Sequence, residues 1–127
     1  ANDNPDFAKL AGSAAKGACI INVPTPEVLL YDVAKDFLKN YKATYGKLPP
    51  SIWTLMNADG MRAIIYGMEQ TKSFDNKKVA DFLMSMEKPL PGITGPLQFA
   101  KDGNRIGSSY MTFEIQADNS YKVVHAQ

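Results

Sequence analysis

Apolar and polar positions recur with two different periods along the chain, which predicts helices in most of it and strands near both ends. Residues 7–15 have helical spacing and stop at Gly17. The run from Ala18 to Val23 is apolar and partly β-branched, with glycine before it and proline after it, so it predicts a buried strand. Cys19 lies in this run, and we expect it to be a small buried residue.

A first long amphipathic helix should follow this strand. Thr25 is placed to cap it, Pro26 to occupy its first position, and Gly46 to end it. The lysines between these points alternate with the apolar residues and indicate a solvated helix face, not a basic binding patch. The predicted apolar face consists of Leu30, Val33, Ala34, Phe37, Leu38, Tyr41 and Tyr45.

A second helix should begin after Ser51 and run to about Thr71. Gly60, Ala63 and Gly67 form a flank of small side chains on it. Because a mid-helix glycine costs up to ~1 kcal/mol relative to alanine, we expect a neighbouring backbone to approach this flank closely. The stripe expected to be buried consists of Leu55, Ala58, Met61, Ile65 and Met68, with Ile64 beside it.

A third helix should open at Asp75 and stop before Pro89. Residues 89–105 are then rich in glycine and proline, and the pair Asp102-Gly103 predicts a turn. The inward residues of the third helix are expected to be Val79, Phe82, Leu83 and Met86.

The end of the chain has strand spacing. Apolar residues alternate with polar ones over 111–115, which predicts a half-buried strand. A turn at 118–120 and a last strand over 121–125 complete a hairpin. The local order is helix, strand, three helices, strands, an α+β pattern with too few parallel strands for a complete doubly wound sheet.

Composition argues against several function classes. The chain has 127 residues, 45% of them hydrophobic, and a net charge of +1, which fits one globular domain and gives no sign of a nucleic-acid or anionic-membrane partner. One cysteine and one histidine, His125, cannot supply the three or four nitrogen and sulfur ligands of a zinc site. The segments GITG and KDGN lack the spacing of phosphate-binding loops. We therefore expect no catalytic residue, no metal and no cofactor.

Four segments carry a family resemblance: GSAAKGACIINVPTP at 12–26, FLKNYKATYGKLPP at 37–50, ADGMRAIIYGMEQTKSFD at 58–75 and GITGPLQFAKDGNR at 92–105. In this order they resemble the periplasmic binding proteins of the leucine/isoleucine/valine-binding type, the solute receptors of ABC importers. Lys16 stands where an acidic residue is common in that family, and Ala58 stands where a tyrosine is common. These departures weaken what the resemblance implies about the ligand more than what it implies about the fold.

The resemblance implies an α/β fold class, as a fragment of the two-lobed periplasmic binding protein type I fold. Family members are much longer, so the chain is expected to be the C-terminal part of such a receptor. Residues 1–23 would end lobe 2 and cross to lobe 1, and residues 24–93 would form a helical segment of lobe 1. Residues 94–127 would return across the hinge and end as a hairpin of lobe 2.

The function implied is that of an extracellular or periplasmic solute-binding component that closes on branched-chain amino acids or related amino and aromatic acids. The implied partners are this small-molecule ligand, the permease membrane subunits and the missing N-terminal part of the same receptor, with self-association of the fragment as a further expectation. The expected location is the periplasm, or the cell surface as a lipoprotein, reached by a signal peptide not present in this chain. The alternative is a ligand-sensing domain of a signalling or regulatory protein with the same fold.

The resemblance also places the only tryptophan. Aligned on ADGM, Trp53 falls where the family has an aromatic residue that borders the ligand cleft. An indole at a helix start offers a flat apolar wall and one N–H donor. Met56 and Asn57 in the following turn are expected near the same mouth. The alternative is that Trp53 packs between the lobes.

Overall fold

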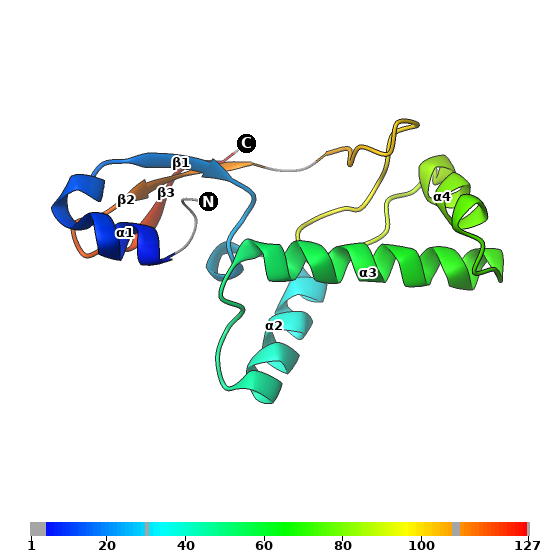
Figure 1. The fold of residues 1–127 in the computed structure, drawn as a ribbon, viewed down its shortest axis with the longest axis horizontal. Coiled ribbons are helices and arrows are strands. Elements are labelled where there is room, and N and C mark those ends of the chain that lie inside the picture. The colour runs from blue at the N-terminus through cyan, green and yellow to red at the C-terminus, as the bar shows by residue number, and fades with distance from the viewer. Residues whose placement is uncertain (1–4, 30, 108–109, 127) are drawn as a thin grey trace.

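Two hydrophobic clusters organise the chain. The computed structural model describes residues 5–29, 31–107 and 110–126. A small sheet with one helix lies on one side and three further helices lie on the other, in what we call the sheet half and the helical half (Figure 1). The buried members of the cluster in the sheet half are Ala8, Ala15 and Ile115, and those of the cluster in the helical half are Val23, Leu29, Ala34, Ile52, Leu55 and Ile93.

The sheet half contains three antiparallel strands in the order β1-β2-β3. Ile20 lies opposite Phe113, and Phe113 lies opposite Val123. The predicted alternation of β2 is confirmed, because Phe113 and Ile115 are buried on one face. The elements are α1 (Pro5–Ala11), a 3₁₀ turn (Gly12–Ala15), β1 (Cys19–Asn22), β2 (Met111–Ile115) and β3 (Tyr121–Ala126).

The expectation that β1 is a buried strand is wrong. β1 is the first strand in the sheet order, so β2 flanks it on one side only. Helix α1 packs through Ala8 against the sheet face that carries Ile115, while Ile21 on the opposite face is 75% exposed. Cys19 shares that face with Ile21 and is exposed, so its predicted burial is wrong for the same reason.

The helical half contains a 3₁₀ turn (Pro26–Val28), α2 (Asp32–Tyr45), α3 (Ile52–Thr71) and α4 (Asn76–Ser85). Thr25 precedes the short turn, so the prediction that it caps the long helix is wrong, and α2 starts only after Tyr31. Gly46 ends α2 in the left-handed region with φ 72°, as predicted. Residue 30 lies outside the described residues, so its predicted place on the apolar face is untested.

The predicted ends of α3 are confirmed, but its predicted buried stripe is only partly right, since Leu55 is buried while Ala58 and Met68 are half-buried. The side that packs inward carries Ile52, Leu55, Asp59, Ala63 and Gly67. Met61 is 58% exposed, and Ile64 and Ile65 are exposed as well. Small residues occupy the last part of this side, where α4 packs close to Gly67. Met61, Ile64 and Ile65 lie on the opposite face of the helix, which we call the outer face of α3.

The two glycines of α3 differ in their surroundings. A Cβ at Gly67 would lie 2.9 Å from Cγ1 of Val79 on α4, so a neighbour does approach closely here, but its side chains make the contact and not the backbone that was predicted. Gly60 is exposed, and a Cβ there would meet no atom within 4 Å, so the prediction of a close neighbour is wrong at this position. Only Gly67 is therefore required by packing.

Local turn chemistry follows the sequence closely. The Asp75 carboxylate accepts the Lys78 amide N–H at 2.9 Å and caps α4. In the β2–β3 turn the Asp118 carboxylate accepts hydrogen bonds from the hydroxyl and the amide of Ser120, and these bonds lower the pKa of Asp118 below its usual 3.8. The predicted turn at Asp102-Gly103 is also present, with Gly103 at φ 83°.

We expect opposite effects from alanine at the two glycines of α3. Gly60→Ala should raise the free energy of unfolding by up to ~1 kcal/mol, because alanine is the better helix former and the site is open. Gly67→Ala should lose that gain and destabilise the protein by roughly 1–3 kcal/mol, because Val79 and Leu83 must move. Urea unfolding of both variants measures the difference. Equal shifts of the two midpoints would contradict the packing described at Gly67.

Candidate functional site

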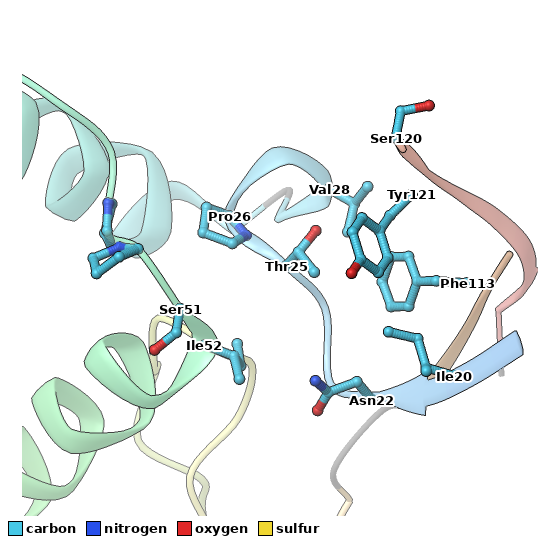
Figure 2. A pocket seen from close by; sticks show the side chains of 12 residues that line it. Ile20, Asn22, Thr25, Pro26, Val28, Ser51, Ile52, Phe113, Ser120 and Tyr121 are labelled. Carbon is cyan, nitrogen blue, oxygen red and sulfur yellow. The ribbon is translucent and has the colours of Figure 1, made fainter. Parts of the chain in front are cut away.

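A cavity of about 410 Å³ lies at the junction of the two halves (Figure 2). The side chains of β1, β2 and the start of β3 face the side chains that lead into α2 and α3 across it (Figure 2). Its lining consists of Ile20, Asn22, Thr25, Pro26, Val28, Pro49, Pro50, Ser51, Ile52, Phe113, Ser120 and Tyr121. The cavity is therefore built by segments that are far apart in the sequence.

The lining of the cavity combines apolar side chains with polar side chains that carry no charge. Phe113 is 1% exposed, and Ile20 beside it in the sheet is half-buried, so these two side chains give a firm apolar wall. Hydroxyl groups of Thr25 and Ser51 and the amide of Asn22 add hydrogen-bonding capacity. All the described lining side chains are uncharged, which suits the apolar or uncharged part of a small molecule.

The start of α3 forms one rim of this cavity. Pro49 and Pro50 precede Ser51, which stands at the N-cap with extended backbone, φ −157° and ψ 162°. The first amide groups of a helix carry a partial positive charge, and the first turn of this one has no acidic side chain. The rim contributed by α3 is thus weakly electropositive although it carries no charged residue.

The structure places Trp53, Met56 and Asn57 together on the first turns of α3, directly after the residues of the rim. The Trp53 side chain is 56% exposed, and Asn57 is exposed as well. Met56 is half-buried and packs against the cluster of the helical half. The cavity lining contains none of these three described residues, so their role in binding stays a prediction.

Sequence reasoning missed Asp59, whose buried side chain joins α3 to the loop after α4. Its carboxylate is 2% exposed and accepts three hydrogen bonds, from the Ile93 amide at 2.6 Å, the Thr94 amide at 2.8 Å and the Thr94 hydroxyl at 2.7 Å. The signal in the sequence is spacing, since Asp59 lies four residues after Leu55 and four before Ala63, both on the buried side of the helix.

A second polar contact extends this arrangement. The Arg105 guanidinium donates one hydrogen bond to the Thr94 hydroxyl at 2.7 Å and two to the Pro96 carbonyl oxygen, at 3.2 and 3.1 Å. Gly92 is required just before this contact, because a Cβ there would collide with the Gly95 carbonyl oxygen. The loop after α4 is therefore held in one conformation against α3.

Within residues 5–29, 31–107 and 110–126, His, Cys, Asp and Glu side chains form no group of three suited to a metal ion. In the same part of the chain, every helix is too short or too polar to cross a membrane.

Residues 1–120 match a protein-family model described as "Periplasmic binding protein". The chain belongs to this family. The match includes residues of both halves and the cavity lining up to Ser120, and it leaves out all of β3 (Tyr121–Ala126). No curated protein matches the sequence.

Solved structures of periplasmic binding proteins have the same fold. The leucine-binding protein LivK of Thermotoga maritima is similar with a TM-score of 0.83 and 23% identity, over 98% of this chain and 34% of that one. LivJ of Streptococcus pneumoniae, in complex with isoleucine, is similar with a TM-score of 0.72 and 22% identity, over 97% and 33%. A solute-binding protein of R. palustris, in complex with benzoate, has a TM-score of 0.70 and 15% identity, over 93% and 32%.

Two facts follow from these likenesses. At such identities they establish the fold, which is a fragment of the type I periplasmic binding protein fold, as predicted. The chain also spans only about a third of the length of each of these structures.

The fluorescence of Trp53, the only tryptophan of the sequence, tests whether its side chain is exposed. Because Trp53 is more than half exposed, its fluorescence should have the emission of a solvated indole and should be quenched efficiently by acrylamide. Trp53→Phe should remove this signal and serve as the blank. A blue-shifted emission that resists the quencher would contradict the exposed position on α3.

Proposed function

We propose that the chain is the C-terminal part of a two-lobed solute receptor, the binding component of an ABC importer. The observation that carries the proposal is a pair of separate hydrophobic clusters in a chain of this family, with a cavity where the two halves meet. A ligand that touches both sides of a cleft favours the closed arrangement, because only that arrangement makes all the contacts.

In this proposal the two halves belong to different lobes. Residues 1–23 end lobe 2 and cross, residues 24–93 form helices of lobe 1, and residues 94–127 return to lobe 2. Two features support two crossings: β1 leads through Val23 into the cluster of the helical half, and the loop after α4 leads back to β2. Figure 1 shows the first of these segments, which leads from β1 in the sheet half into the helical half.

The proposed ligands are amino acids with apolar side chains or small aromatic acids. Isoleucine and benzoate, bound by two of the similar structures, both join a carboxylate to an apolar body. The wall of Phe113 and Ile20 suits such a body, and the neutral polar groups of the lining suit a molecule with few charges.

Trp53 is proposed to line the cleft, with Met56 and Asn57 in the following turn. The support is its exposure, since a large aromatic side chain left in solvent at a helix start is typical of a binding surface.

The outer face of α3 is proposed to pack against the N-terminal part of the same receptor. Met61, Ile64 and Ile65 are exposed there on a single helix, which is more apolar surface than a free helix face usually carries. Without that part, self-association through the same face is the expected outcome. The closed receptor would then be recognised by the permease subunits, in the periplasm or at the cell surface.

Replacing the indole tests the proposed cleft. In the receptor that includes the N-terminal part, Trp53→Ala should raise the ligand Kd at least several-fold without unfolding, because it removes an apolar wall. The matched control is Phe74→Ala, since Phe74 is 87% exposed and lies beyond the opposite end of α3. Equal affinities for wild type and Trp53→Ala would return the indole to a packing role.

The ligand class is tested by calorimetric titration of the same receptor with leucine, isoleucine, valine and benzoate. We expect binding of at least one of them, and no binding of lysine, whose side chain would bring a charge to a neutral wall. Binding of lysine alone, or of none of these compounds, would argue against the proposed class.

A further inference from the structure

One hydroxyl group connects a buried anion to a cation. Thr94 donates its hydroxyl hydrogen to the Asp59 carboxylate at 2.7 Å, and the same oxygen accepts a hydrogen bond from Arg105 at 2.7 Å. Asp59 is on α3, whereas Thr94 and Arg105 stand at the two ends of the segment that follows the turn at Gly92. The three side chains therefore join a helix to both ends of one loop.

That loop is a closed hairpin, which we call the 94–106 hairpin. Phe99 pairs with Arg105, and the Ile106 amide donates to the Gln98 carbonyl oxygen at 2.8 Å. Closer to the tip, the Ala100 amide donates to the Asn104 carbonyl oxygen at 2.8 Å. Because these bonds tie its two arms together, the hairpin can move only as one piece.

Among the described residues, the hydrogen bonds that leave the hairpin lead to α3, to the end of α4 and to the loop after α4. Leu90 and Leu97 exchange two backbone hydrogen bonds, at 2.9 and 2.8 Å. The Gln98 side-chain amide donates to the Met86 carbonyl oxygen at the end of α4. Together with the contacts of Asp59, these bonds fix the hairpin to α3 and α4 rather than to the sheet.

We infer that Asp59, Thr94 and Arg105 form a latch that makes the 94–106 hairpin part of the helical half, so that the returning chain is rigidly attached to lobe 1 as far as Ile106. The inference rests on the proposed function only where it speaks of lobes. It refines the boundary at residue 94: the chain turns back there, but it stays fastened to α3 well beyond that point. Any change of angle between the halves is then absorbed outside the hairpin.

Thr94 is the positioning residue of the latch. Valine has nearly the same shape but can neither donate to Asp59 nor accept from Arg105, so Thr94→Val removes the link while filling the same space. The Asp59 carboxylate then keeps only its two backbone donors. The Thr94→Val substitution should therefore weaken the attachment of the hairpin to α3 and leave the sheet half unchanged, since no side chain of the sheet half takes part in the latch.

Hydrogen exchange of the 127-residue chain tests the latch without any ligand. In Thr94→Val the amides of Ile93, Leu97 and Ile106 should exchange at least about tenfold faster, while those of Phe113 and Ile115 keep their wild-type rates. Asp102→Ala is the matched control, because Asp102 bonds only with Asn104 at the hairpin tip and does not touch the base. Unchanged exchange in Thr94→Val, or equal acceleration in the sheet, would overturn the latch.

A second measurement tests whether Asp59, Thr94 and Arg105 act together as one latch or make independent contacts. Asp59→Asn and Arg105→Gln each should speed exchange of the Ile93 and Thr94 amides, and the double variant should be no faster than the faster single one, because both break the same link. If the acceleration of exchange in the double variant equalled the product of the two single accelerations, the two contacts would be independent and the latch would be refuted. Neither experiment uses a ligand, so failure of the receptor to bind amino acids would count against the proposed function and leave the latch standing.

Discussion

A carboxylate on the buried side of α3 sets the conformation of the helical half. Burying an ionised group costs several kcal/mol unless hydrogen bonds replace its water, so the Asp59 carboxylate has to be surrounded by donors. Ile93 and Thr94 supply them, which fixes the turn at residues 92–95 at one height on the helix. Ile93 then packs into the cluster with Leu55, and Gly92 must have no side chain. A polar requirement thus positions part of the apolar core.

The apolar residues that do not enter this cluster are as informative as those that do. The outer face of α3 and the open face of the sheet both keep large side chains in solvent, among them Met61 and Ile21. Surfaces of this kind usually face another protein surface. The chain spans about a third of the length of the similar structures. In the proposed receptor, the N-terminal part would pack against these exposed apolar surfaces.

Several turns and helix ends could be predicted from the sequence because they depend on local chemistry, although the start of α2 could not. Gly46 ends α2 through its left-handed backbone, and Asp75 caps α4 through its carboxylate. Burial could not be predicted in the same way, because it depends on what lies opposite. Cys19 is apolar enough to be buried but occupies an open strand, and the outer stripe of α3 has ideal helical spacing with no partner in the described chain.

The candidate site shows the same division. A tryptophan at a helix start attracts attention in the sequence, and the structure leaves it exposed beside the rim. Asp59 could not be recognised in the sequence, because a charged residue in a helix is ordinarily on the surface. Its role becomes visible only when residues 93–94 are seen to donate hydrogen bonds to it. The cavity was equally out of reach, since its wall joins β1 and β2 to the start of α3 from opposite ends of the chain.

The separation of the two clusters bears on how the chain melts. They have no residue in common, so the sheet half and the helical half need not lose their structure at the same temperature. Cooperativity of the whole would then come from whatever occupies the space between them, and a molecule held there would merge two melting events into one.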